Sequence, residues 1–170
     1  MHLGYLPQEP ALYPYLSGEE MLRFLARVRG VARIDDALEV ADLGAATKRT
    51  TREYSFGMQK RLAFAGVLLG EPRAILLDEI FAGLDPVATS RFVAQIRRER
   101  ARGAAGILSG HELDTVADLA DRVCMLVAGR LVRTLAGEEL SRLRAERGAL
   151  ERLFHELAGG SVAGGEPTVR

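Results

Sequence analysis

The stretch Ala74-Ile75-Leu76-Leu77-Asp78-Glu79 decides the fold of this chain. A short unbroken apolar run is typical of a strand that is buried on both faces of a parallel sheet. Such a strand delivers the two carboxylates that follow it to the edge of the sheet, where open α/β folds bind their ligands. One carboxylate can hold Mg²⁺, usually through water, and the next can accept a proton from an attacking water. Because acidic strand ends are common, two solvated acids are the competing interpretation.

Strands and helices alternate on both sides of this stretch. Ser17 and Glu20 form the pattern of a capping box, and Asp85 before Pro86 predicts the start of another helix. The alternation predicts an α/β fold, a mostly parallel sheet flanked by helices, with a helical subdomain over about 12–70. The expected strands are 3–6, 74–77 and 107–108, the last two of them buried, with a hairpin of 122–127 and 130–134 about Ala128-Gly129. The expected helices cover 17–30, 35–43 (closed by Gly44), 57–69, 86–103, a segment after His111 to about 121, 138–146, and 149–158 (stopped by Gly159-Gly160). In the helix over 86–103, the side chains expected to point inward are Val87, Phe92, Val93 and Ile96. The segment 45–54 reads as a loop.

Composition excludes several classes of protein. The 170 residues carry 23 basic and 23 acidic side chains, and this neutrality argues against a sequence-independent nucleic-acid binder or a polybasic membrane-surface protein. The one cysteine, Cys124, falls in an expected buried strand and rules out an internal disulfide framework or a cysteine zinc cluster. No apolar run is long enough for a transmembrane helix.

Three further segments carry groups that suit a nucleotide. In Tyr54-Ser55-Phe56-Gly57-Met58-Gln59-Lys60-Arg61, a serine and a glycine at a helix start offer a hydroxyl, backbone amides and a positive dipole end to a phosphate. Gln8 lies in a loop after the first expected strand, and His111 follows a later one. Taken singly, each has an ordinary structural interpretation as a cap, a core histidine or a solvated loop residue.

The order Gln8, Ser55–Met58, Asp78-Glu79, Asp85 and His111 resembles that of the ATP-binding-cassette (ABC) transporter ATPases, over about residues 3–158. The signature of this chain, Tyr54–Met58, reads Tyr-Ser-x-Gly-Met where many members have Leu-Ser-Gly-Gly-Gln. In this it is similar to the ATPases of exporters whose membrane domain is a separate chain. The resemblance implies part of a P-loop NTPase domain over residues 1–158 and a disordered tail over 159–170.

The resemblance also implies roles, residue by residue. It makes Asp78 the Walker B aspartate that holds Mg²⁺ together with Gln8, and Glu79 the catalytic base, with His111 as the switch histidine. It implies ATP and Mg²⁺, a homodimer or a second ABC ATPase subunit, and a separate transmembrane permease, with no nucleic acid. The place of action would be the cytoplasmic face of the membrane. The nucleotide-binding residues that it implies are Gln8, Ser55, Phe56, Gly57, Met58 and Asp85.

The chain departs from the family pattern at two places. Phe56 stands where the common signature has glycine, and a ring there could alter the approach of backbone to phosphate. The Walker A pattern Gly-x-x-x-x-Gly-Lys-Ser/Thr is absent, because Lys48 follows Thr47 and Lys60 follows Gln59. We therefore expect an N-terminally truncated ATPase domain with weak ATP binding, an unpaired sheet edge, an exposed apolar face and poor solubility.

Two other functions compete with an ATP-hydrolysing exporter subunit. A non-enzymatic module could lend the signature Ser55–Met58 to a complete partner. A DNA-repair or translation ATPase is disfavoured, because the segment between Gln8 and Ser55 shows no sustained heptads of a coiled coil and because translation members usually carry two cassettes.

Overall fold

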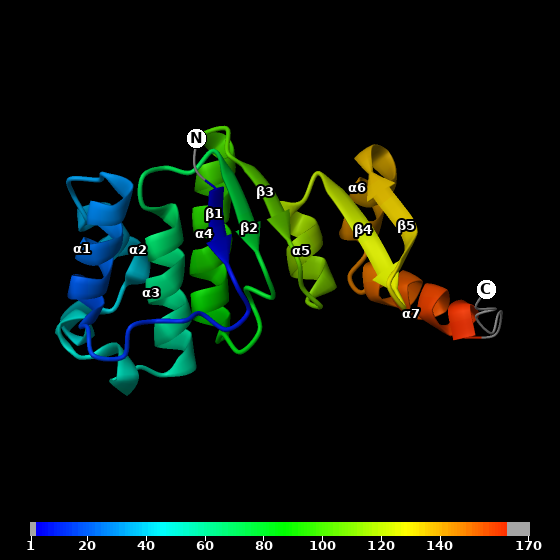
Figure 1. The fold of residues 1–170 in the computed structure, drawn as a ribbon. Coiled ribbons are helices and arrows are strands. Elements are labelled where there is room, and N and C mark those ends of the chain that lie inside the picture. The colour runs from blue at the N-terminus through cyan, green and yellow to red at the C-terminus, as the bar shows by residue number, and fades with distance from the viewer. Residues whose placement is uncertain (1–2, 163–170) are drawn as a thin grey trace, which may run out of the picture. The chain divides into compact units, whose positions relative to one another are not determined.

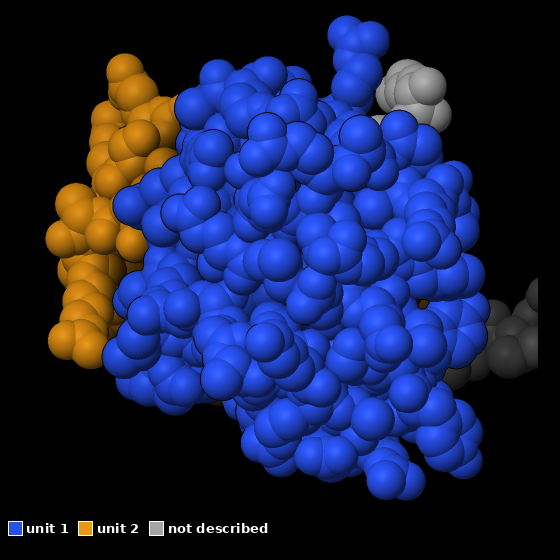
Figure 2. All heavy atoms as spheres, turned by 90° about the vertical axis from the view of Figure 1, so that its left-hand side faces the viewer, with its two compact units in different colours: residues 1–110 blue, residues 111–170 orange. Residues whose placement is uncertain are grey.

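The structure, a computed structural model, describes residues 3–162 of the chain. The chain divides into two compact units, residues 1–110 and residues 111–170 (Figure 2). None of the helices in the described range is long and apolar enough to cross a membrane.

A three-stranded sheet of unit 1 follows the predicted pattern. Strands β1 (Leu3–Leu6), β2 (Ala74–Leu77) and β3 (Ala105–Leu108) are parallel in the order β1-β2-β3, with β2 in the centre (Figure 1). Because the strands are parallel and in register, the residues that follow Leu6, Leu77 and Leu108 all leave from the same edge of the sheet. That edge is where the predicted site residues Gln8, Asp78 and Glu79 lie.

The two faces of this sheet differ. Leu6 and Leu77 are buried, and Gly4 on the same face approaches Val67 so closely that a Cβ would lie 2.7 Å from its Cγ1 atom. The opposite face exposes Leu3, Tyr5 and Ile107, the last at 69%. The prediction that 107–108 is a buried strand is therefore wrong, because β3 is an edge strand that pairs, within residues 3–162, only with β2. Within residues 3–162 the outer edges of β1 and β3 have no partner strand, so the expected unpaired edge is confirmed, as is the exposed apolar face with Leu3, Tyr5 and Ile107.

Helices α1 (Gly18–Arg29), α2 (Asp35–Ala41) and α3 (Phe56–Leu68) pack side by side in unit 1 (Figure 1). Ser17 caps α1 as predicted: its hydroxyl accepts from the Glu20 N–H (3.2 Å), the Glu20 carboxylate accepts from the Ser17 N–H (2.8 Å), and Gly30 ends the helix in a left-handed conformation. The bounds are α1 Gly18–Arg29, α2 Asp35–Ala41, two 3₁₀ turns η1 Gly44–Lys48 and η2 Thr51–Glu53, and α3 Phe56–Leu68. Their shared core holds Met21, Leu22, Ala26, Ile34, Ala37, Ala41, Leu43, Tyr54, Leu62, Ala65 and Leu69.

Two details of this helical block differ from expectation. Helix α2 ends at Ala41 and not at 43, because Asp42 takes the left-handed conformation (φ 46°) and ends the helix before Gly44 is reached. Asp42 can adopt it because a short polar side chain tolerates that region better than most. The segment expected to be a loop over 45–54 contains η1 and η2, whose short 3₁₀ turns leave no apolar periodicity to detect.

Helix α4 (Pro86–Ala101) begins as predicted, with Asp85 as N-cap and Pro86 in the first turn. Phe92 and Ile96 are buried, and the Phe92 ring stacks on Phe64 of α3 with centroids 4.5 Å apart. The expectation that Val87 points inward is wrong, since Ala88 takes the buried position of the first turn and its neighbour lies about 100° around the helix. Val93 is half-buried.

Unit 2 is built around the predicted hairpin. Ala128 and Gly129 both have positive φ, as a tight two-residue turn requires. Cys124 is exposed and not buried as expected, because Val123 and Met125 occupy the inward positions of the alternating strand β4 (Arg122–Val127). Helix α7 (Ala149–Val162) continues through Gly159-Gly160, where a stop and a disordered tail were expected. The rest of that expected tail, 163–170, lies outside the described residues. The elements are α5 Leu113–Leu119, β4 Arg122–Val127, β5 Arg130–Ala136, α6 Gly137–Ala145 and α7 Ala149–Val162, around a core of Ala117, Val123, Met125, Leu135, Leu140 and Leu150.

Candidate functional site

The two acids after β2 are held by the serine that follows β3. The Asp78 N–H continues the sheet by donating to the Leu6 carbonyl (2.9 Å), and the Ser109 N–H does the same to the Leu77 carbonyl (2.9 Å). The Ser109 hydroxyl donates to the Asp78 carboxylate and accepts from the Glu79 N–H (3.0 Å). Sequence reasoning missed Ser109, although its place directly after a parallel strand put it at the same edge. Gln8 is exposed in the loop after β1.

The backbone of Glu79 adopts a conformation that is unusual for a residue with a side chain. Its φ is +46°, in the left-handed region, which costs an L-residue about 1–2 kcal/mol. The Glu79 carbonyl accepts from the Lys60 ammonium at 2.6 Å, and the Ala82 carbonyl accepts from the same ammonium at 2.8 Å. Side chains from two other segments, Lys60 and Ser109, thus hold both peptide groups of Glu79. Sequence reasoning did not anticipate this role of Lys60.

The signature segment forms the start of α3, which runs for 13 residues. Ser55 is its N-cap, and the Ser55 hydroxyl accepts from the Met58 N–H at 3.3 Å. Tyr54 anchors the segment: its ring is buried in the helical core, its hydroxyl donates to the Ala46 carbonyl (2.7 Å), and burial raises the pKa of that hydroxyl. Ser55 and Phe56 remain exposed, while Gly57 and Met58 are half-buried. The free N–H groups and positive dipole end of α3 can bind an anion there.

The signature packs on the turn that follows β2. The Phe56 ring lies so close to Gly83 that a Cβ on that glycine would be 3.1 Å from two ring atoms, and the Lys60 ammonium lies 5.1 Å from the ring centroid. We call the set Phe56, Lys60, Glu79, Ala82 and Gly83 the signature–turn contact. It gives a physical reason for the aromatic residue at 56: the ring covers the turn and the lysine.

The last two predicted site residues have local partners. Asp85 follows the turn, and its Oδ1 atom accepts from the Ala88 N–H (2.8 Å), which is the capping bond of α4. His111 opens unit 2, is exposed, and has its Nε2 atom 3.4 Å from a Glu112 carboxylate oxygen. The structure thus brings Ser55–Met58 close to the turn after Asp78-Glu79. His111 is the first residue of unit 2.

The residues at the sheet edge suit a magnesium ion but not the phosphates of a nucleotide. The carboxylate of Asp78 and the hydroxyl of Ser109 are the hard oxygen ligands that Mg²⁺ prefers. A phosphate cradle needs a lysine on a glycine-rich loop, and the chain has two lysines: Lys48 is exposed at the end of η1, and Lys60 is buried on backbone carbonyls. Asp78 and Ser109 therefore suit a metal ion, while neither lysine of the chain is available to a phosphate loop.

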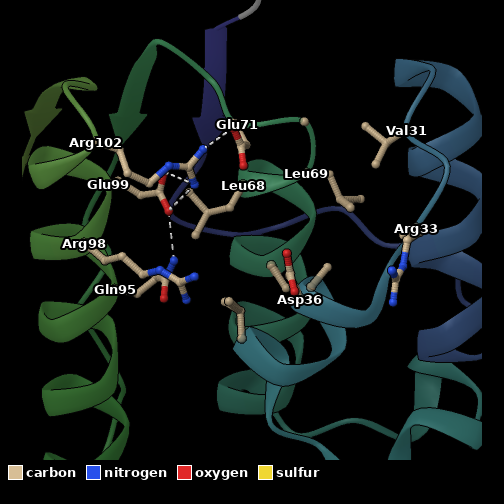
Figure 3. A pocket seen from close by; sticks show the side chains of 14 residues that line it. Val31, Arg33, Asp36, Leu68, Leu69, Glu71, Gln95, Arg98, Glu99 and Arg102 are labelled. Carbon is tan, nitrogen blue, oxygen red and sulfur yellow. Dashed lines mark hydrogen bonds and ion pairs between the residues drawn. The ribbon is translucent and has the colours of Figure 1, made fainter.

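A hollow of about 410 Å³ lies elsewhere in unit 1, between α2, the end of α3 and α4 (Figure 3). None of the predicted site residues lines it. Its buried Glu99 accepts from Gln95 (2.9 Å) and pairs with Arg102, which also pairs with Glu71 (2.5 Å). Three arginines and three acids line the hollow, so it has no excess of positive charge to attract a polyphosphate.

A parallel sheet with acids at the end of its central strand, beside a helix start that can bind an anion, is the arrangement of an α/β nucleotide-binding domain. The family model for ABC transporters matches residues 1–82. A solved "ATP binding subunit of ABC transporter" superposes with a TM-score of 0.78 at 30% identity, covering 91% of this chain and 68% of that one. The chain belongs to the ATP-binding domains of the ABC transporter family.

Two curated relatives are similar to most of the chain. The ABC transporter ATP-binding protein YhcH of Bacillus subtilis is 36% identical over 135 residues, which is 77% of this chain and 44% of the relative. A fluoroquinolones export ATP-binding protein of Mycobacterium tuberculosis is 38% identical over 147 residues, 85% of this chain and 49% of the relative. The chain thus spans about half the length of these curated relatives or slightly less.

Proposed function

We propose that this chain supplies the signature, the Walker B acid and the catalytic base of an ATP-hydrolysing subunit of an ABC exporter. The observation that carries the proposal is the pair Asp78-Glu79 at the end of the central strand, bonded through Lys60 to the helix that starts with the signature. Membership of the family supports ATP as the nucleotide, and the similarity to a fluoroquinolones export protein supports export. Residues 1–158 would then form most of one ATPase domain.

Each site residue has a chemical task in this proposal. Asp78, with Gln8, would hold Mg²⁺, which neutralises phosphate charge, and Ser109 keeps the Asp78 carboxylate oriented. Glu79 accepts a proton from the attacking water. The phosphate loop has to come from residues other than these 170. Ser55, Phe56, Gly57 and Met58 would contact the γ-phosphate of a nucleotide that the opposite subunit holds. Asp85 would lie at the interface between the two subunits. His111 would contact the γ-phosphate as the switch histidine.

The segment after Gln8 supports a membrane-embedded partner. In residues 9–16, Tyr15 is 80% exposed, and Tyr13 is exposed although its ring meets Phe24 of α1 edge-on at 5.4 Å. Exposed aromatic side chains are enriched at the centre of protein interfaces. We therefore propose that residues 9–16, with the exposed Tyr13 and Tyr15, bind a separate permease subunit at the cytoplasmic face of the membrane. The neutral net charge favours a protein partner over nucleic acid.

The test is a charge-removing substitution in the assembled transporter that contains this chain. Glu79→Gln is expected to lower ATP turnover about 10²- to 10⁴-fold, the usual contribution of a general base. Glu39→Gln, which makes the same chemical change at an exposed position of α2, is the matched control. Turnover that survives Glu79→Gln at the rate of the control would refute the assignment.

A second candidate is a non-enzymatic module that lends its signature to a complete ABC ATPase. The observation that favours it is the exposed start of α3 in a chain whose two lysines both lie outside a phosphate loop. In this case Ser55→Ala lowers turnover in the complex, Glu79→Gln does not, and a partner with an intact Walker A lysine co-purifies. Loss of turnover with Glu79→Gln excludes the module.

A further inference from the structure

Lys60 is the unusual residue of α3. Its side chain is fully buried, at 0% exposure, although lysine is among the residues that are almost never buried without partners. The ammonium donates to the carbonyls of Glu79 (2.6 Å) and Ala82 (2.8 Å) and lies against the Phe56 ring. These contacts join α3 to a turn that is far from it in the sequence.

We propose that Lys60 is a positioning residue for Glu79, an inference that rests on the proposed function for the role of Glu79 itself. Glu79 is held at φ +46°, a conformation that persists only where the surroundings over-determine it. Its N–H is restrained by Ser109 and its carbonyl by Lys60, so the direction in which the Glu79 side chain leaves the backbone depends on both.

The same ammonium makes the position of Glu79 depend on the position of the signature. Ser55 caps the helix that carries Lys60, and coupling between sites can be carried by rigid secondary elements. A displacement of the start of α3 therefore displaces the ammonium and, with it, the two carbonyls of the turn. Because the signature and Glu79 serve different nucleotides in the proposed assembly, Lys60 links the two sites within one chain.

The first test is backbone hydrogen exchange on the chain itself, and it requires no ATP turnover. Lys60→Met keeps the unbranched apolar stem and removes the donors, and Lys48→Met makes the same change at the exposed lysine. Lys60→Met is expected to speed amide exchange in residues 79–85 about 10- to 100-fold, the factor that corresponds to losing a hydrogen bond to a charged group, with α1 unchanged. Lys60→Arg, which restores a charged donor, is expected to restore much of the protection.

Unchanged exchange in residues 79–85, or a uniform rise over all of unit 1, would overturn the inference. If Lys60→Met does not fold, Lys60→Gln keeps one N–H donor on a shorter stem and is expected to give an intermediate rise in the same segment. Exchange of Lys60→Gln at the rate of the unsubstituted chain would equally overturn it.

The second test uses the assembled transporter. Lys60→Met is expected to lower kcat for ATP by about tenfold or more while KM stays unchanged, because displacement of a catalytic group acts on the chemical step. Turnover that survives Glu79→Gln removes the proposed function but leaves the exchange result valid. Loss of turnover with Glu79→Gln, combined with unaltered exchange and kcat in Lys60→Met, would refute the positioning role alone.

Discussion

Gly83→Ala tests the signature–turn contact by its effect on stability. Gly83 has a φ of +74°, and a Cβ there would lie 3.1 Å from two atoms of the Phe56 ring. The left-handed backbone alone costs alanine about 1–2 kcal/mol. Carbon atoms prefer about 3.5–4.0 Å, so the ring must also move by a few tenths of an ångström. Overpacking in a core costs about 1–3 kcal/mol, and we take the low end because Phe56 is 42% exposed.

Gly30→Ala is the matched control, since Gly30 has a φ of +68° with no atom within 4 Å of the added Cβ. We expect it to lower the free energy of unfolding by about 1–2 kcal/mol and Gly83→Ala by about 2–3 kcal/mol. The tyrosines, Tyr5, Tyr13, Tyr15 and Tyr54, all lie in unit 1 and the chain has no tryptophan. Urea unfolding followed by tyrosine fluorescence therefore reports on the unit that contains both glycines.

A double-mutant cycle with Phe56→Ala separates the contact from the backbone strain. If the ring causes the extra loss, Gly83→Ala in the Phe56→Ala background is expected to cost about 1 kcal/mol less than in the original chain. Equal losses for Gly83→Ala and Gly30→Ala, or additivity in the cycle to within about 0.3–0.5 kcal/mol, would refute the contact.

Four further results are expected. The N–H and hydroxyl of Ser17 lower the pKa of Glu20, so its contribution to stability is present above the unfolded pKa and is lost as the pH falls through the folded value. Glu20→Gln should remove that pH dependence in urea titrations, and an unchanged acid limb would contradict the bond. Phe64→Ala should destabilise unit 1 by about 3–5 kcal/mol, as measured by the same unfolding assay, because it empties a buried stack; a loss below 1 kcal/mol would argue against that packing. Ile107→Lys should raise the concentration at which the chain stays monomeric in sedimentation, because it places a charge on the exposed edge strand, and no change would show that other surfaces drive association. The isolated chain should bind a fluorescent ATP analogue weakly or not at all, and micromolar Mg²⁺-dependent binding would contradict this.

The parts of the fold that local rules govern could be predicted from the sequence. The capping pair Ser17 and Glu20, the Asp85-Pro86 helix start and the Ala128-Gly129 turn each act over a few residues, and all three are confirmed. The errors lie at residues whose burial depends on segments that are far from them in the sequence. Ile107 and Cys124 have the composition of buried strands, but edge position and face decide their exposure.

The candidate site shows the same division. The acids Asp78 and Glu79 could be placed at a sheet edge because parallel strands end together, whereas their roles in ATP hydrolysis stay predictions. Lys60 could not be found, because a lysine within a helix looks like a solvent-facing residue until the turn that covers it is known. Ser109 could have been found, since only the end of β3 was needed to place it.

The pairing of the sheet has a consequence for the order in which the chain folds. β1 lies beside β2, so Leu3 pairs with Ala74, whereas the hairpin of unit 2 pairs Val127 with Arg130. Closing a long loop has to precede the first of these pairings, and proteins rich in such contacts fold slowly. On the ribosome β1 emerges before β2, and the two strands cannot pair until residue 77 has left the exit tunnel. We therefore expect the helices between them to form first, and the slowest refolding phase of the chain to report the arrival of β1 at β2.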